Sequence, residues 1–130
     1  MIIWRPKEIK DQECRVSATP SAVMQMVGAG HTVLVETNAG AGIGRPDEDY
    51  ELAGAEIVED AAKLWERSDF IYKVKEPGAD EYKYMRKWQI IFCYLHVAAD
   101  EPLLNALLES GAVGIAYETI EEFGNLPLLK

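Results

Sequence analysis

The sequence has little cysteine and no long hydrophobic run. Its two cysteines, Cys14 and Cys93, lie far apart in the chain, which indicates no disulfide framework and favours reduced thiols in a cytoplasmic protein. No stretch approaches the roughly 20 apolar residues that a membrane-spanning helix needs. The first ten residues, MIIWRPKEIK, lack the apolar core of a secretory signal peptide. The sequence therefore predicts neither membrane insertion nor secretion.

Positive charge is also scarce. Lysine and arginine number 13 against 22 aspartates and glutamates, which gives a formal net charge of −9. A nucleic-acid ligand is not expected, because binding to phosphates depends on clustered positive charge. Hydrophobic residues make up 48% and charged residues 27% of the 130 residues, as in an ordinary globular protein. The length predicts one domain over residues 1–130, large enough to fold around a core without a metal ion.

Strand and helix patterns alternate along the chain. Short apolar or β-branched runs predict strands at residues 2–4, 32–36, 56–58, 70–75, 90–95 and 113–117. Between them, helices are predicted at residues 21–27, from an Asp47 cap to residue 52, after an Asp60 cap, around residues 82–86 and at residues 101–110. This alternation predicts an α/β fold: a mostly parallel open sheet with helices on both faces, of the Rossmann or flavodoxin-like three-layer type.

Polar residues directly follow several of the predicted strands. In an open parallel sheet, ligands bind outside the carboxyl ends of the strands. Arg15 follows the first strand, Lys75 closes the fourth, His96 follows the fifth and Glu118 follows the last. An arginine pairs with a carboxylate through two hydrogen bonds, a lysine polarises a ketone oxygen, and a histidine transfers protons near neutral pH. This set fits a small oxo acid as ligand.

Each of these residues has an ordinary structural alternative. Arg15 and Lys75 are equally compatible with solvated loop charges. His96 is compatible with a structural histidine after a buried strand, and Glu118 with a capping or surface residue. His31, which follows a glycine turn, is interpreted as structural.

A glycine cluster over residues 40–44 follows the second strand. A dinucleotide-binding loop has the pattern G-x-G-x-x-G and leads directly into a helix. Here Arg45 stands where the third glycine belongs, and Pro46 follows it. A flexible glycine loop is therefore the better interpretation.

A set of short motifs in order along the chain resembles the N-terminal part of alanine dehydrogenase, in the family shared with the alpha subunit of nicotinamide nucleotide transhydrogenase. The resemblance covers nearly all 130 residues. The motifs are Arg5-Pro6-Lys7-Glu8-Ile9-Lys10, Glu13-Cys14-Arg15-Val16, Ala29-Gly30-His31, Val33-Leu34-Val35-Glu36, Ala39-Gly40-Ala41-Gly42, Asp47-Glu48-Asp49-Tyr50, Ala53-Gly54-Ala55-Glu56-Ile57, Val74-Lys75-Glu76-Pro77, Tyr94-Leu95-His96 and Ala116-Tyr117-Glu118-Thr119.

The resemblance implies a substrate-binding domain. The transhydrogenase branch lacks a histidine at the position of His96, so the chain looks like the alanine dehydrogenase branch. That enzyme interconverts L-alanine with pyruvate and ammonium, using NAD. By resemblance, Arg15 and Lys75 bind the substrate, and His96 is the catalytic acid and base. The family's NAD-binding domain would lie after residue 130, so no cofactor is expected on this chain alone, and a homo-oligomer is expected.

Two features depart from the family pattern. Trp4 stands where a glycine is usual, and this indole would either block the substrate pocket or repack the end of the sheet. Trp88 is a second unusual aromatic residue. An alternative reading is therefore a non-catalytic scaffold or assembly module, an excised or redesigned domain that keeps the fold.

Overall fold

A computed structural model describes residues 1–9, 15–122 and 124 of the chain. Six strands form one sheet: β1 (Ile2–Arg5), β2 (Thr32–Glu36), β3 (Glu56–Val58), β4 (Phe70–Lys75), β5 (Ile90–Tyr94) and β6 (Val113–Ala116). Their order across the sheet is β3-β2-β1-β4-β5-β6, and each neighbouring pair is parallel. This is the strand order of a Rossmann fold, so the predicted fold class is confirmed.

Four α-helices connect these strands: α1 (Pro20–Gly28), α2 (Asp47–Leu52), α3 (Ala61–Arg67) and α4 (Glu101–Ser110). Short 3-10 turns occupy Ala41–Ile43, Ala79–Tyr84, Val97–Ala99 and Tyr117–Thr119. Capping explains where three of the helices begin. The side chains of Thr19, Asp60 and Asp100 each accept a hydrogen bond from a backbone N–H in the first turn of α1, α3 and α4.

The prediction that Asp47 caps α2 is wrong. Pro46 is the capping residue, and Asp47 is already inside the helix. The Asp47 carboxylate instead accepts hydrogen bonds from the Thr37 hydroxyl at 2.7 Å and from the Asn38 amide at 2.9 Å. It thus stabilises the turn after β2. The helix expected around residues 82–86 is the 3-10 turn over Ala79–Tyr84, and the last strand ends at Ala116 because Tyr117 begins another turn.

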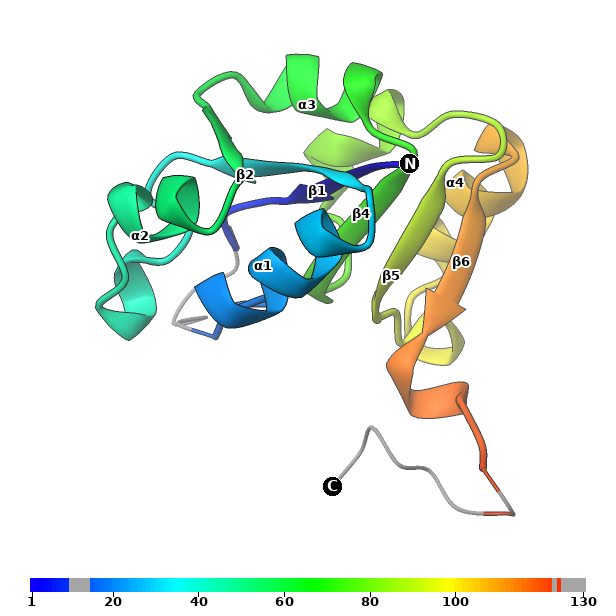
Figure 1. Ribbon diagram of the computed structural model, residues 1–130. Coiled ribbons are helices and arrows are strands. Elements are labelled where there is room, and N and C mark those ends of the chain that lie inside the picture. The colour runs from blue at the N-terminus through cyan, green and yellow to red at the C-terminus, as the bar shows by residue number, and fades with distance from the viewer. Residues whose placement is uncertain (10–14, 123, 125–130) are drawn as a thin grey trace.

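The helices cover both faces of the sheet, with α1 and α2 on one face and α3 and α4 on the other (Figure 1). On the α1 face, Val23, Val33, Val35 and Tyr50 form a buried cluster. On the α3 face, a larger cluster contains residues of the sheet together with Leu64 and Trp65 of α3 and Leu103 and Leu107 of α4. Successive residues of a strand belong alternately to the two clusters, as expected for strands buried on both faces.

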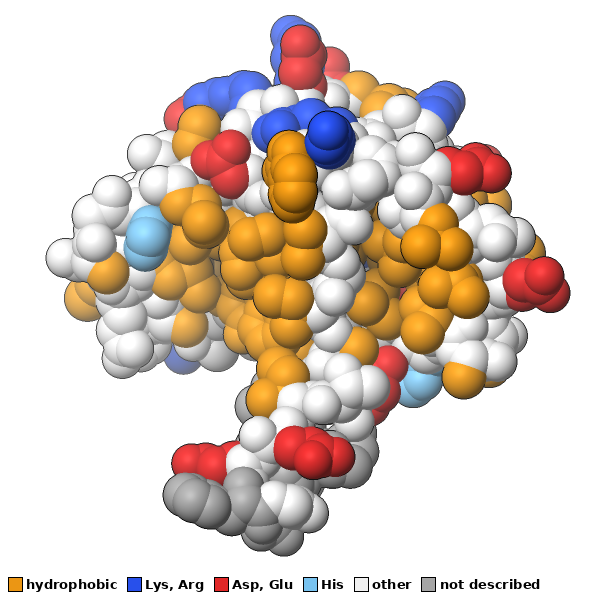
Figure 2. Space-filling model, turned by 90° about the vertical axis from the view of Figure 1, so that its right-hand side faces the viewer, with side chains coloured by type: hydrophobic (Ala, Val, Ile, Leu, Met, Phe, Trp, Pro, Cys, Tyr) orange, Lys and Arg blue, Asp and Glu red, His pale blue; other side chains and the backbone are white. Residues whose placement is uncertain are grey.

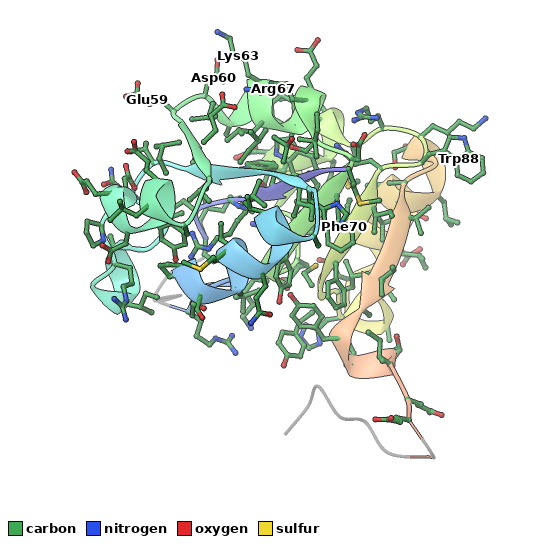
Figure 3. The ribbon with its side chains drawn as sticks, in the orientation of Figure 1. Glu59, Asp60, Lys63, Arg67, Phe70 and Trp88 are labelled. Carbon is green, nitrogen blue, oxygen red and sulfur yellow. The ribbon has the colours of Figure 1, made fainter. Side chains whose placement is uncertain are left out.

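Trp4 is part of the larger cluster. Its side chain is 1% exposed, and its ring meets Trp65 edge to face, with 5.2 Å between the ring centroids. Of the two sequence expectations for this residue, the structure thus favours repacking of the sheet over a ring placed in a ligand pocket. Trp88, in contrast, is 73% exposed and extends outward from the loop before β5 (Figure 3).

The edge strand β6 is covered on one face only. Gly114 packs toward the α4 side, where an added Cβ would lie 3.0 Å from Leu95 and 3.5 Å from Leu107. Val113 and Ile115 alternate to the other face, and each is 37% exposed. Figure 2, which views the molecule from the β6 side, shows hydrophobic side chains gathered in this region. Within the described residues, no helix is long and apolar enough to cross a membrane.

Candidate active site

The strand order reverses between β1 and β4, because the chain adds β2 and β3 on one side of β1 and β4 to β6 on the other. Connections after β1 and β4 therefore leave in opposite directions and open a crevice at the carboxyl ends of these strands. Arg15 lies in the connection after β1, and Lys75 is the last residue of β4. The two predicted substrate-binding residues thus belong to the two segments that border this crevice.

The segment that carries Arg15 is anchored to the sheet by its neighbours. The Ser17 hydroxyl donates a hydrogen bond to the Tyr72 carbonyl at 2.6 Å. The Ala18 carbonyl accepts hydrogen bonds from Arg5 Nε at 2.8 Å and from the Tyr50 hydroxyl at 3.0 Å. Arg15 itself is exposed. An ordered backbone therefore presents a solvent-accessible guanidinium at the crevice.

Arg5 is a structural residue that the sequence reasoning did not identify. It is 1% exposed, its guanidinium lies over the Tyr50 ring at 4.9 Å, and its Nη2 donates to the Ala39 carbonyl at 3.0 Å. Burial lowers the pKa of Arg5, although the nearby Tyr50 and Glu8 oppose this shift. Arg5 thus joins the end of β1 to the segments that follow β1 and β2.

Arg15 borders two neighbouring cavities. The first, of about 390 Å³, is also lined by Tyr72, Val74, Tyr94 and Tyr117. The second, of about 200 Å³, is lined by Lys7, Glu8 and residues of the glycine loop. An apolar cavity of about 450 Å³ beside α1 contains His31 but no lysine or arginine among its described lining residues. Both Arg15 cavities thus have a cation that can bind a carboxylate, whereas the described lining of the cavity beside α1 has none.

Lys75 is half-buried, and its backbone is held by Glu8. The Glu8 carboxylate accepts hydrogen bonds from the backbone amides of Val74 at 3.2 Å and Lys75 at 3.0 Å. In the sequence, Glu8 stands out only as part of a family motif. A periodicity argument gives no signal for such a contact, because it joins residues 67 positions apart.

His96 and Glu118 are in contact, as their positions after neighbouring strands predict. The His96 backbone amide donates a hydrogen bond to Glu118 Oε1 at 2.8 Å, so Glu118 binds the backbone of His96 in this contact and not its imidazole. His96 has a left-handed backbone, with φ of 51°, and its exposed ring stacks on Tyr94 at 6.1 Å between centroids. Glu118 Oε2 is buried without a hydrogen-bond partner among the described residues. Glu118 thus helps to hold the unusual His96 backbone, which presents the imidazole to solvent.

The glycine loop does not fit a dinucleotide. A Cβ on Gly40 would lie 2.5 Å from the Arg45 carbonyl and 2.6 Å from the Tyr50 ring, so this glycine serves a close packing contact. The helix that follows, α2, has Asp47, Glu48 and Asp49 in its first turn, and these carboxylates would repel a pyrophosphate. In the part of the chain that the structure describes, no group of three or more histidines, cysteines or acidic residues is arranged to hold a metal ion.

Comparisons with known proteins agree with this architecture. The family model described as "Alanine dehydrogenase/PNT, N-terminal domain" matches residues 4–130. The chain belongs to this family of N-terminal domains. It is 51% identical to the alanine dehydrogenase of Bacillus subtilis (strain 168) over 129 residues, and 52% identical to that of Halomonas elongata over 130 residues. It covers 99% of its own length in both comparisons but only 34% and 35% of these relatives.

Solved structures give the same assignment. A structure of L-alanine dehydrogenase superposes with a TM-score of 0.95 at 50% identity, covering 99% of this chain and 36% of that one. The transhydrogenase from Sinorhizobium meliloti superposes with a TM-score of 0.87 at 28% identity, covering 95% of this chain and 36% of that one. The chain is thus more similar to the alanine dehydrogenase branch of the alanine dehydrogenase/PNT family. It spans about a third of the length of these relatives.

Proposed function

We propose that this domain binds the oxo-acid substrate of an NAD-dependent alanine dehydrogenase, which interconverts L-alanine with pyruvate and ammonium. The observation that supports the proposal is that Arg15, Lys75 and His96 lie at the carboxyl ends of β1, β4 and β5, three neighbouring strands, with the strand order reversing between the first two. Two independent lines of reasoning, the positions of the strand ends and the family resemblance, select the same three residues.

Each residue has a role that suits its surroundings. The exposed Arg15 guanidinium pairs with the substrate carboxylate through two parallel hydrogen bonds. The Lys75 ammonium binds the oxo oxygen of pyruvate and stabilises negative charge that develops there. The His96 imidazole, which is free to reach solvent, transfers the proton to and from the substrate oxygen or nitrogen. Glu118 accepts a hydrogen bond from the His96 backbone amide and so holds the backbone that carries this imidazole.

NAD supplies the hydride chemistry in the family. Because the glycine loop does not fit a dinucleotide, we expect the NAD site in the part of the relatives that this chain does not span. Hydride transfer needs the cofactor beside the substrate. We therefore expect the 130-residue chain by itself to leave NADH unoxidised in the presence of pyruvate and ammonium, and sustained oxidation above background would contradict this.

Binding of pyruvate to variants of the chain tests the substrate proposal. Arg15→Met and Lys75→Met should each weaken pyruvate binding about tenfold or more, because each removes a charged hydrogen-bond partner of the ligand. Lys63→Met is the matched control, because Lys63 is an exposed lysine on α3 (Figure 3), on the opposite face of the sheet from α1. Titrations followed by NMR give the affinities. Equal affinities for all four proteins, or no binding by the wild type, would favour the scaffold interpretation.

A further inference from the structure

Strand β4 contains an irregularity at the position of the proposed substrate lysine. Tyr72 is paired with Phe92, but the next pair is Lys75 with Tyr94, so three steps along β4 match two along β5. This is a β-bulge with one extra residue. With regular pairing, Val74 would lie opposite Tyr94, and Lys75 would share a face with Lys73.

The bulge therefore decides which face of the sheet receives Lys75. Lys73 is 1% exposed and lies in the interior, whereas Lys75 is half-buried and takes the register position of Tyr94. Tyr94 lines the Arg15 cavity, and its ring stacks on His96. The extra residue thus brings Lys75 into register with the other candidate site residues.

Side chains from three other segments hold the bulge. The Tyr72 carbonyl accepts a hydrogen bond from Ser17, and the Lys73 carbonyl accepts one from the Tyr117 hydroxyl at 2.6 Å. The neighbouring strand β1 pairs with β4 through Ile3–Phe70 and Trp4–Ile71, so this pairing ends before the bulge. Beyond that pairing, the two Glu8 carboxylate oxygens accept from the Val74 and Lys75 amides.

Glu8 is built into the interior together with a counter-charge. Its side chain is 5% exposed, and Lys73 Nζ lies 3.8 Å from Glu8 Oε1. A buried carboxylate costs free energy unless it is paired and hydrogen-bonded, and Glu8 has both kinds of partner. Glu8 also lines the small cavity next to Arg15.

We propose that Glu8 is a positioning residue for Lys75. Its carboxylate bridges the two bulge amides, Lys73 balances its charge, and the bulge so held presents Lys75 on the same face as Tyr94. This inference rests on the proposed function insofar as Lys75 is taken to bind substrate. The arrangement of the bulge itself does not depend on any ligand.

The Glu8→Gln variant of the chain tests the proposal. Glutamine has nearly the same size but provides one acceptor oxygen instead of two and no charge. We expect faster hydrogen exchange at the Val74 and Lys75 amides and weaker NMR contacts between Lys75 and Tyr94. We also expect pyruvate affinity to fall about tenfold, with loss of the pyruvate-induced shift of the Lys75 signals. Glu36→Gln is the matched control, because Glu36 also accepts a backbone N–H, from Lys7, and also interacts with the charge of Lys73, but it accepts no hydrogen bond from the Val74 or Lys75 amide.

The design separates the two proposals. If the wild type fails to bind pyruvate, the substrate proposal falls, while the exchange rates and the contacts between Lys75 and Tyr94 still decide whether Glu8 holds the bulge. Unchanged exchange and contacts in Glu8→Gln overturn the positioning role, as does a pyruvate affinity within twofold of wild type when the wild type binds. If Glu8→Gln does not fold because Lys73 is left unpaired, the double variant Glu8→Gln/Lys73→Met removes both charges and is measured instead.

Discussion

Two buried charged residues near the carboxyl ends of the strands stabilise the backbone there, although burying their charges costs free energy. Arg5 and Glu8 both lie within the fold, and each binds backbone groups from segments distant in the chain. Glu36, which is half-buried, also binds the backbone: its carboxylate accepts the Lys7 amide at 2.7 Å. Burial raises the pKa of Glu36, and the amide of Lys7 and the charge of Lys73 only partly offset this shift.

The raised pKa of Glu36 predicts a pH-dependent effect of removing its charge. Because the folded state holds the Glu36 proton more tightly than the unfolded chain, ionisation of Glu36 lowers stability as pH rises from its ordinary pKa of about 4.3 through the higher folded value. Glu36→Gln abolishes this loss and keeps an acceptor for Lys7. Urea unfolding at several pH values from 4 to 7 should show the stability of Glu36→Gln improving relative to wild type as pH increases. A relative decline of the variant over this range would contradict the assignment.

The place of a residue in the fold could be predicted from sequence where the strand order alone decides it. Arg15, Lys75 and His96 were selected because they follow strands, and the parallel order of the strands brings them to one edge. Arg5 and Glu8 were not selected, because their roles depend on partners far away in the chain. Cys93 is buried, and Cys14 lies outside the described residues. Burial also raises the pKa of Cys93, which disfavours the reactive thiolate.

At the scale of elements, the loop after β2 is shaped by packing. Gly40 has no room for a side chain, because an added Cβ would lie 2.5 Å from a backbone oxygen and 2.6 Å from the buried Tyr50 ring. Gly28, the last residue of α1, has no atom within 4 Å of its virtual Cβ and offers a direct comparison.

The two glycines should therefore respond to alanine in opposite ways. Gly40→Ala should destabilise the fold by about 1–3 kcal/mol through overpacking. Gly28→Ala should stabilise it by up to about 1 kcal/mol, because alanine reduces the freedom of the unfolded chain and favours the helix. Chemical unfolding of both variants measures the difference. A Gly40→Ala variant as stable as wild type would show that the loop adjusts at little cost.

Whether a segment forms a strand or a helix was predictable where its own residues carry a clear pattern. The β-branched and apolar runs predicted the six strands to within a residue or so, and the predicted Asp60 cap lies at the start of α3. Asp47 was misassigned because an aspartate before a helix also binds turns, and the choice depended on the approach of Thr37 and Asn38. The bulge in β4 was not predictable, because the alternation of Ile71, Tyr72 and Lys73 looks regular up to the insertion.

At the scale of the whole molecule, the open face beside β6 predicts self-association. Among the residues that the structure describes, β6 pairs with β5 and with no other strand, and Val113 and Ile115 add exposed apolar surface next to its outer edge. An unpaired edge with apolar neighbours favours pairing with a second copy. Sedimentation velocity over a range of concentrations should show dimers or larger species, which Ile115→Lys should reduce. Leu108→Lys, at a residue 72% exposed on α4, should not reduce them. A strict monomer at high concentration would contradict this prediction.

We propose above that the edge of the sheet carrying Arg15, Lys75 and His96 binds substrate, which requires this edge to be a preformed site. A titration of the isotope-labelled chain with pyruvate, followed through assigned backbone and histidine NMR signals, tests it most directly. We expect saturable shifts confined to Arg15, Lys75, His96 and their neighbours in the crevice. Spectra that stay unchanged up to tens of millimolar pyruvate, or shifts spread evenly over the surface, would contradict it.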